Sequence, residues 1–335
     1  MIERCRRAIK PERGSSGVSA TATEVRAPRD PSTMRILVSG SSGLIGTALC
    51  QRLLALGHQV LRLVRRPPAL DTGEVYWNPA APSIDAAGLE GLDAVVHLAG
   101  ESIAGGRWTA RRQRRIRDSR VHGTRLLCEQ LAGLDRRPAV LVCASAMGYY
   151  GDRGDRVLDE GSGPGNTFLA GVVQEWEAST ATAARAGIRV ALPRFGMVLD
   201  SRAGALARML SPFRLGLGGR IGGGQQYWSW VALEDAVEIL CFALAGEALD
   251  GAFNAASPNP ATCAEFALTL GGVLGRPTFL PLPGWAARLA LGRMADELLL
   301  ASVRMAPRRL LELGYPFRYP DLEGALRHAL GAGLA

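Results

Sequence analysis

The fold of this chain is decided by one stretch of sequence, Gly40-Ser41-Ser42-Gly43-Leu44-Ile45-Gly46. A short apolar run, residues 35–38, precedes it, and an apolar stretch with helical character, residues 44–56, follows it. In this strand–turn–helix setting, glycines allow a tight turn and a close backbone approach to a diphosphate. The open N–H groups and the positive end of the helix dipole then favour the anion. The stretch therefore predicts a dinucleotide site whose phosphate contacts are Gly40, Ser41, Ser42, Gly43, Leu44 and Ile45.

Length and composition restrict the class of protein. The chain has 335 residues, of which 47% are hydrophobic and 21% charged, as in globular proteins with a large core. No apolar run reaches the roughly 18–20 residues of a membrane span, so no membrane partner is expected. The six cysteines are widely spaced without a CxxC pair, which predicts free thiols in a reducing, cytoplasmic location. Four unclustered histidines argue against a metal site.

The net charge of +8 is largely local, because residues 107–125 hold eight arginines and a single acid, Asp118. Three interpretations stay open: a basic helix face in water, a phosphate-binding surface, or a nucleic-acid surface. Aromatic residues between the arginines are few, with Trp108 alone, so we expect no nucleic-acid partner. Such a helix would also repel a second copy of itself, which favours a monomer.

The order of elements predicts an α/β fold. Residues 1–33 show no apolar period and are expected to be a disordered tail or to precede a true start at Met34. From there strands and helices alternate, which predicts a doubly wound parallel sheet. Residues 34–200 would form a Rossmann domain that binds NAD(P), and residues 201–330 a smaller C-terminal substrate lobe. The predicted strands of the sheet are 35–39, 59–64, 74–77, 94–98, 139–144 and 188–194, and the helices between them are 44–56, 109–132 and 168–186. Beyond residue 200 we predict helices at 203–215, 233–245 and 262–274 and a short strand near 278–282.

The end of the second strand predicts which dinucleotide binds. A site for NAD usually offers a carboxylate there to the ribose 2′-hydroxyl. This chain offers Arg65 and Arg66, and guanidinium groups suit a 2′-phosphate. We therefore predict NADP as the cofactor in preference to NAD; the alternative is two solvated loop charges.

The fourth strand ends in His97-Leu98-Ala99-Gly100. Small residues at this place allow the backbone to lie against the adenosine side of a cofactor, so Leu98, Ala99 and Gly100 are predicted to contact it. His97 is expected to be a packed residue at the strand end.

Together these motifs resemble the short-chain dehydrogenase/reductase superfamily, in its extended, epimerase-like branch. They are most similar to an atypical subgroup of nucleotide-sugar-epimerase-like proteins with a C-terminal domain of unknown function, here at about residues 275–325. The resemblance covers Met34 to about Leu330 and implies an NADP(H)-binding oxidoreductase or epimerase-like enzyme whose small-molecule substrate is not identified. It is carried by Arg107-Trp108-Thr109, Gly123-Thr124, Ser145-Ala146-Met147-Gly148-Tyr149-Tyr150-Gly151, Arg194-Phe195-Gly196, Trp228-Ser229-Trp230, Asn254-Ala255 and Pro307-Arg308-Arg309-Leu310.

The chain departs from the superfamily in its proton-transfer residues. Typical members use a Tyr-x-x-x-Lys pair, whose lysine lowers the pKa of the tyrosine. The resemblance places Leu169 and Val173 at these positions and Ala146 at the position of the partner serine, and the only lysine of the chain is Lys10. Whether the chain turns over a substrate therefore stays open. The alternative function is an inactive NADP(H)-binding sensor or scaffold.

Two tyrosines follow the fifth strand, at the edge where open α/β sheets bind ligands. Tyr150 is the candidate catalytic residue, as an unconventional proton donor, and Tyr149 is a candidate substrate contact; packing is the alternative for both. The resemblance implies that Ser145 and Arg120 approach the cofactor, although Arg120 could equally lie on a solvated helix face.

The glycine-rich stretch 216–224 precedes an aromatic cluster. In the resembling family this stretch lies over the substrate cleft, which implies that Gln226 and Trp228 contact a substrate. The alternative is a glycine loop covered by core tryptophans.

Overall fold

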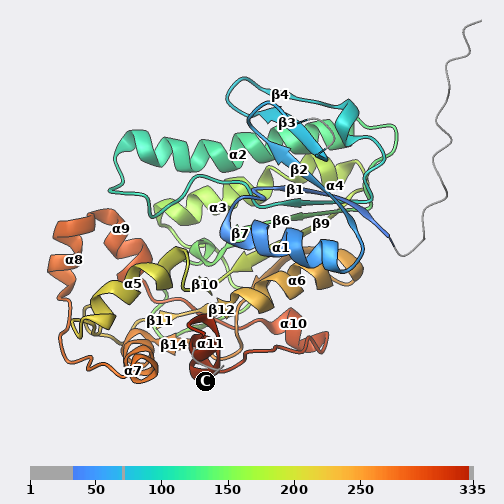
Figure 1. Cartoon of the computed structure of the whole chain (residues 1–335). Helices are drawn as coiled ribbons and strands as arrows, with labels where there is room; N and C mark the ends of the chain where they lie inside the picture. The colour runs from blue at the N-terminus through green and yellow to red at the C-terminus, as the bar shows by residue number, and fades with distance from the viewer. Residues whose placement is uncertain (1–32, 70–71, 332–335) are drawn as a thin grey trace, which may run out of the picture. The chain divides into compact units, whose positions relative to one another are not determined.

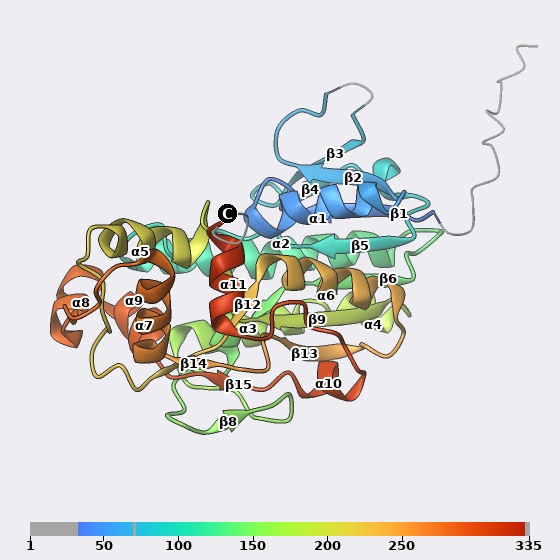
Figure 2. The same cartoon turned by 60° about the horizontal axis from the view of Figure 1, so that its bottom comes forward.

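The computed structural model describes residues 33–69 and 72–331. The prediction of a tail at 1–33 lies, apart from Thr33, outside the described residues. Within them, nine strands form one large sheet (Figures 1 and 2). These strands are β1 (Arg35–Ser39), β2 (Gln59–Val64), β3 (Glu74–Asn78), β4 (Ser83–Ile84), β5 (Ala94–His97), β6 (Val140–Cys143), β7 (Ser145–Ala146), β9 (Arg189–Phe195) and β13 (Gly251–Ala255).

The sheet has the strand order of a doubly wound α/β fold. Its order is β13-β9-β6-β5-β1-β2-β3-β4, and all of these pairs are parallel except β3 with β4. The chain reverses its direction of winding between β1 and β5. Ligands of such sheets bind beyond the carboxyl ends of the strands at this switch point. The predicted parallel sheet is therefore confirmed, and it places the glycine stretch that follows β1 at the expected edge.

Helices cover both faces of the sheet, as parallel sheets require. They are α1 (Leu44–Ala55), α2 (Ala110–Ala132), α3 (Phe168–Ala178), α4 (Ala181–Arg185) and α6 (Leu233–Ala245). Successive residues of β1 point to opposite faces: Ile36 and Val38 join a core under α1 and α6, whereas Leu37 joins a core under α2, α3 and α4. The apolar runs of the central strands are explained by this burial on both sides.

The remaining elements lie mostly beyond the carboxyl ends of the strands (Figure 2). They are the strands β8 (Val157–Leu158), β10 (Met197–Leu199), β11 (Tyr227–Trp228), β12 (Trp230–Ala232), β14 (Ala261–Thr262) and β15 (Arg304–Met305), and the helices α5 (Gly204–Arg214), α7 (Cys263–Leu274), α8 (Gly284–Leu291), α9 (Arg293–Ala295), α10 (Arg308–Glu312) and α11 (Leu322–Ala329). Short helical turns are η1 (Ala87–Leu89), η2 (Met147–Tyr149) and the π-helical turn η3 (Asp296–Leu300). A separate core joins α5, α7 and α11 around Trp228 and Trp230.

The structure differs from the sequence-based expectation at three places. The helix predicted over 168–186 is divided into α3 and α4. The strand predicted near 278–282 is reduced to two isolated bridges, at Phe279 and Leu282. Finally, α6 and β13, which belong to the predicted C-terminal lobe, return to the large sheet. The predicted domain boundary at residue 200 stays a prediction. Beyond it, the chain returns to the first domain with α6 and β13.

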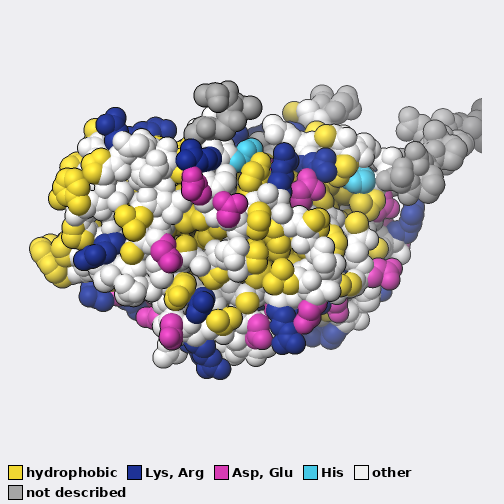
Figure 3. Space-filling view, turned by 90° about the horizontal axis from the view of Figure 1, so that it is seen from below, with side chains coloured by type: hydrophobic (Ala, Val, Ile, Leu, Met, Phe, Trp, Pro, Cys, Tyr) yellow, Lys and Arg dark blue, Asp and Glu magenta, His cyan; other side chains and the backbone are white. Residues whose placement is uncertain are grey.

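No helix in the described part of the chain is long and apolar enough to cross a membrane. On the face shown in Figure 3, basic and acidic side chains are interspersed among apolar ones.

Candidate functional site

The glycine turn after β1 leaves no room for a side chain at two positions. Gly40 has a φ of +67°, and a Cβ on it would lie 2.7 Å from the carbonyl carbon of Leu98. A Cβ on Gly46 would lie 2.2 Å from the carbonyl oxygen of Gly40. The turn therefore needs glycine both to bend and to contact the loop after β5. Between these glycines, Ser41 is half-buried and Ser42 is exposed.

The N-terminus of α1 is open to an external acceptor. A threonine hydroxyl caps each of α2 and α3, but Gly43 offers α1 no side-chain cap, and no acidic residue lies in its first turn. The N–H of Thr47 bonds to the carbonyl of Gly43 at 2.9 Å. The preceding N–H groups, of Leu44 and Ile45, therefore lack an acceptor in the helix. With the helix dipole behind them, they suit a diphosphate.

Ser39 fixes the loop that faces this turn. Its Oγ accepts hydrogen bonds from the N–H groups of Leu98 (3.1 Å) and Ala99 (3.3 Å) and lies 2.6 Å from Nδ1 of His97. The hydroxyl hydrogen therefore goes to Nδ1. His97 is completely buried, and desolvation lowers its pKa from 6.5 to about 4. It is thus a neutral packed residue, as expected, and it contacts the Ser39 hydroxyl that holds Leu98 and Ala99 beside the glycine turn.

The two arginines after β2 have different surroundings. Arg66 forms an ion pair with Glu74 of β3 at 2.5 Å and also donates to the carbonyl of Pro67. Arg65 is exposed and makes no hydrogen bond or ion pair with another described residue. Among the described residues Arg66 is therefore the paired guanidinium of the two, and a contact of Arg65 with a 2′-phosphate stays a prediction.

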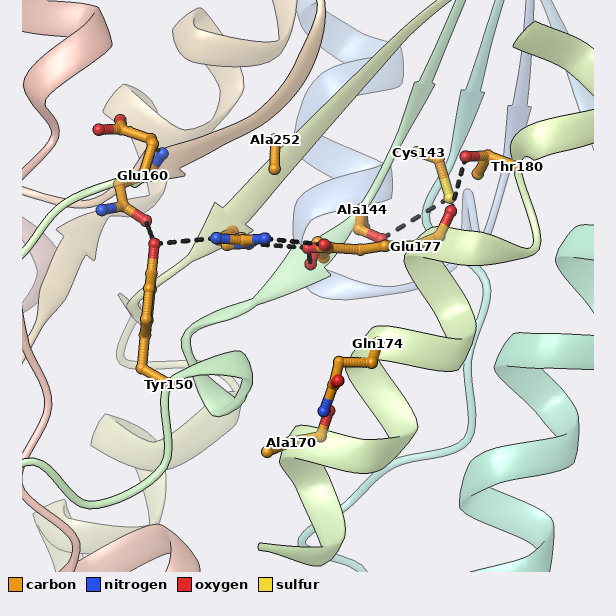
Figure 4. Close-up of polar contacts among 12 residues, drawn as sticks. Cys143, Ala144, Tyr150, Glu160, Ala170, Gln174, Glu177, Thr180 and Ala252 are labelled. Carbon is orange, nitrogen blue, oxygen red and sulfur yellow. Dashed lines mark hydrogen bonds and ion pairs between the residues drawn. The ribbon is translucent and has the colours of Figure 1, made fainter. Parts of the chain in front are cut away.

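A buried ion pair connects α3 with β9 behind the site. Nε and Nη2 of Arg194 each donate to one carboxylate oxygen of Glu177, both at 2.8 Å. Ser145 donates to the same carboxylate at 2.5 Å, and Nη1 of Arg194 donates to the Tyr150 oxygen at 3.1 Å. Figure 4 shows the row of contacts between Tyr150 and Glu177. Burial lowers the pKa of the Arg194 guanidinium, but the hydrogen bonds and the charge of Glu177 outweigh this effect and raise it.

The rings of Tyr149 and Tyr150, from η2 and its C-cap, pack edge to face with their centroids 5.2 Å apart, and both lie beside the Arg194 guanidinium. Tyr150 is 0% exposed, and its hydroxyl donates to Oδ1 of Asn254 at 2.7 Å. Burial raises the pKa of Tyr150. Tyr149 is half-buried, and its ring lies 3.4 Å from Cζ of Arg194. Proton donation by Tyr150 stays a prediction, and it would require the hydroxyl to leave these partners; Tyr149 is the tyrosine that reaches the surface.

With this geometry established, similarity to known proteins defines the family. A family model described as "NAD dependent epimerase/dehydratase family" matches residues 36–256, and one described as "Domain of unknown function (DUF1731)" matches residues 282–329. The chain belongs to the NAD dependent epimerase/dehydratase family. The second match lies where the resemblance implied a C-terminal domain of unknown function.

Individual family members are similar over nearly their whole length. An epimerase family protein of Mycobacterium leprae is 43% identical over 88% of this chain and 95% of its own. The human epimerase family protein SDR39U1 is 38% identical over 88% of this chain and 99% of its own. A crystal structure of human SDR39U1 (isoform 2) with NADPH matches with a TM-score of 0.81 and 36% identity, covering 89% of this chain and 99% of that one.

In this epimerase family chain, the positions that the resemblance assigns to proton transfer are apolar. Leu169 and Val173 of α3 are buried. They lie against η2, since a Cβ on Gly148 would be 3.2 Å from Cβ of Leu169 and 3.9 Å from Cγ2 of Val173. The carboxylate of Glu297 accepts the N–H of Leu169 at 2.8 Å and so holds the start of α3. The face of α3 that meets η2 therefore offers no proton donor at these two positions.

Arg120 holds a loop in this structure. Its Nη1 donates to the carbonyls of Glu101 (3.0 Å) and Ile116 (3.1 Å), and its Cζ lies 5.2 Å from the ring centroid of Trp176. Burial lowers its pKa to about 10. The guanidinium also lies against Gly100. The observed role is thus to position the segment after β5, and a direct contact with the cofactor stays a prediction.

Other arginines of residues 107–125 are partly neutralised. Arg115 forms an ion pair with Glu101 at 2.7 Å, and Arg117 pairs with Glu175 of α3. The helix is therefore less cationic than its sequence indicates. Arginines of this block that remain exposed on α2 include Arg111, Arg114 and Arg125.

Gln226 and Trp228 connect the glycine-rich stretch to η3. Nε2 of Gln226 donates to the carbonyls of Ile221 (2.9 Å) and Leu299 (3.0 Å), and Nε1 of Trp228 donates to Leu299 at 3.3 Å. Trp228 is buried, in the core it shares with Phe266. This packing supports the alternative of a loop covered by core aromatics, and substrate contact stays a prediction for both residues.

Three residues of the buried network, Arg194, Glu177 and Asn254, are not among the site candidates from the sequence, although the sequence carries a signal for two of them. Arg194 and Asn254 are polar residues with apolar residues on both sides, in β9 and β13. A buried charge needs a partner, which indicates an ion pair but not with which residue. Among the described residues, no group of three or more His, Cys, Asp or Glu side chains could hold a metal ion.

Proposed function

We propose that this chain binds NADP(H) and is an oxidoreductase or epimerase-like enzyme of an atypical type, acting on a small molecule that is not identified. One observation carries the proposal: the N-terminus of α1 is uncapped and is reached through a turn in which glycines leave no space for side chains. These features fit a diphosphate. The NADPH in the crystal structure of human SDR39U1, 36% identical, supports the same cofactor here.

Different residues would bind different parts of the cofactor. The turn residues Ser41 and Ser42 and the N–H groups of Leu44 and Ile45 would hold the diphosphate. Arg65, exposed beside the paired Arg66, would bind the 2′-phosphate that distinguishes NADP from NAD.

When bound, NADP(H) supplies or accepts the hydride. The protein would orient the reactants and provide a polar group at the mouth of the site. Tyr149, half-buried and stacked on Arg194, is suited to contact a substrate, whereas Tyr150 is placed to keep that segment rigid. The buried free thiols support a reducing, cytoplasmic location.

A second function is favoured by the apolar surroundings of Leu169 and Val173. A chain that holds NADP(H) but lacks a proton donor on α3 could act as a sensor or scaffold that responds to the cofactor.

Calorimetric titration with NADPH and NADH tests cofactor binding. We expect the wild-type chain to bind NADPH more tightly than NADH, and the Arg65→Ala, Arg66→Ala double variant to lose that preference. Absence of NADPH binding would contradict the proposal.

Oxidation of NADPH with a panel of nucleotide sugars, quinones and aldehydes separates the two functions. Turnover would establish the enzyme, and its loss in Tyr149→Phe or Tyr150→Phe would identify which tyrosine contributes. Binding of NADPH without turnover of any panel member would favour the sensor.

A further inference from the structure

Residues 101–109, which we call the strap, link the loop after β5 to the start of α2. Each of four successive carbonyls of the strap accepts a hydrogen bond from a side chain. Three donors belong to α2 or to the strap itself, and the fourth comes from α5, more than 100 residues further along the chain. In chain order, Glu101 accepts from Arg120 (3.0 Å), Ser102 from Arg112 (2.6 Å), Ile103 from Trp108 (2.7 Å) and Ala104 from Arg208 (2.5 Å).

The bond from α5 closes a ring of contacts, which we call the circuit, that runs through the glycine turn, the strap, α5 and the start of α1. On one side, Gly40 of the glycine turn touches Leu98, from which the chain runs into the strap. On the other, Leu44 at the start of α1 lies against Gly204 at the start of α5, since a Cβ on Gly204 would be 3.9 Å from Cδ2 of Leu44. Arg208, one turn further along α5, reaches the strap. The circuit therefore borders the open N-terminus of α1.

The contacts of this circuit differ in how easily they can open. The contact between Gly40 and Leu98 is made by backbone that is bonded to β1 through Ser39. Arg208, in contrast, is exposed, and its bond to the strap is a single one to a carbonyl. Within the strap, Gly105 and Gly106 follow the four bonded carbonyls. Gly106 has a φ of +141°, which favours glycine and lets the backbone pivot. The Arg208 bond is thus the place where the circuit can open.

We propose that Arg208 is a positioning residue that clasps the strap over the dinucleotide and must release it for the cofactor to exchange. This inference rests on the proposed binding of NADP(H). In the clasp, Arg208 touches the strap and not the cofactor. Loss of the clasp should therefore speed the escape of the dinucleotide without slowing its entry.

Stopped-flow fluorescence of NADPH measures both rates. Bound NADPH is displaced by excess NADP+ to obtain the dissociation rate, and free NADPH is mixed with protein to obtain the association rate. For Arg208→Ala we expect the dissociation rate to rise about five- to tenfold, the effect of losing one hydrogen bond, with an association rate that is unchanged or faster. Arg214→Ala is the matched control, because Arg214 is an exposed arginine of the same helix without such a bond; its rates should stay within about twofold of wild type.

The outcomes separate the clasp from the proposed function. If wild-type protein binds NADPH and Arg208→Ala leaves the dissociation rate unchanged, the clasp is wrong and the cofactor site stands. If the variant both releases NADPH faster and binds it more slowly, Arg208 acts on the phosphates directly and the clasp is again wrong. If wild-type protein takes up no NADPH, the proposed function fails and the clasp fails with it. Thermal unfolding of each variant verifies that the fold is kept.

Discussion

The guanidinium of Arg194 lies 3.4 Å from the ring of Tyr149 while both of its outer edges are hydrogen-bonded, to Glu177 and to Tyr150. A cation over an aromatic face is stabilising, and more so when it is desolvated. The half-buried ring of Tyr149 is therefore held by a charge that is itself fixed in the core. The Arg194–Glu177 ion pair thus helps to orient Tyr149.

Removal of Arg194 should destabilise the whole protein. Arg194→Ala leaves the carboxylate of Glu177 buried without its partner, which costs about 3–5 kcal/mol. Urea unfolding at neutral pH measures the difference from wild type. The matched control is Arg327→Ala, which breaks the exposed pair with Glu323 and should cost less than about 1 kcal/mol. Equal losses in the two variants would contradict a buried ion pair at Arg194.

Two glycine-to-alanine changes should have opposite effects. At Gly46 a Cβ would meet the carbonyl oxygen of Gly40 at 2.2 Å, so Gly46→Ala should displace the turn and weaken NADPH binding at least about tenfold. Gly171, within α3, has nothing within 4 Å of an added Cβ. Gly171→Ala should therefore leave binding unchanged and raise the free energy of unfolding by about 0.5–1 kcal/mol. Calorimetric titration and urea unfolding of both variants test this; full binding by Gly46→Ala would show that the turn does not need glycine.

The two arginines after β2 should contribute unequally to the preference for NADPH. Arg65→Ala should weaken NADPH binding about 10- to 100-fold, the effect of a lost charged hydrogen bond, and leave NADH binding nearly unchanged. Arg66→Ala should weaken NADPH binding less, because Arg66 is already paired with Glu74. Titrations with both nucleotides at two salt concentrations measure these effects. A larger loss in Arg66→Ala would reverse the assignment.

Stability should fall in weak acid because of His97. Its pKa is about 4 in the folded chain and 6.5 in the unfolded chain, so below pH 6.5 the unfolded chain binds a proton that the folded chain does not. The free energy of unfolding therefore decreases as the pH falls from 6.5 towards 4, by up to about 1.4 kcal/mol for each pH unit. Above pH 6.5 this contribution to the pH dependence vanishes.

Variants isolate this effect from that of the carboxylates. His97→Gln should lower stability at pH 7 but flatten the decrease between pH 6.5 and 5, as measured by urea unfolding at several pH values. His122→Gln, at an exposed histidine of α2, should keep the wild-type slope. The same slope in wild type and His97→Gln would show that His97 does not cause the decrease.

Sequence reasoning predicted the sheet well because its signals are local. Short, largely apolar runs predicted β1, β2, β5, β6 and β9 within one or two residues. The division of one helix into α3 and α4 was missed, since alanines and threonines continue the helical pattern through the break. The return of α6 and β13 to the sheet was also missed, because strand order depends on contacts between distant segments.

In the candidate site, too, local features could be predicted from the sequence and contacts between distant residues could not. Backbone requirements at Gly40 and Gly46 can be read from spacing, because a tight turn before a helix limits which residues fit. The partners of side chains could not be predicted: Tyr150 meets Asn254 across 104 positions, and Glu297 reaches Leu169 across 128. Likewise, the backbone carbonyls to which Arg120 and Trp228 donate could not be predicted, and the ligand contacts of both residues stay predictions.

The sequence by itself determined the strand–turn–helix that opens the fold. It also determined that the one lysine is Lys10, so that no lysine lies among the described residues to assist a tyrosine. Only the tertiary structure decided that Arg194 and Glu177 form a buried pair behind Tyr149 and that Arg208 reaches the strap. The physical reason is the distance along the chain over which each interaction acts. Backbone conformation follows from neighbouring residues, whereas the partner of a buried charge is set by how distant elements pack.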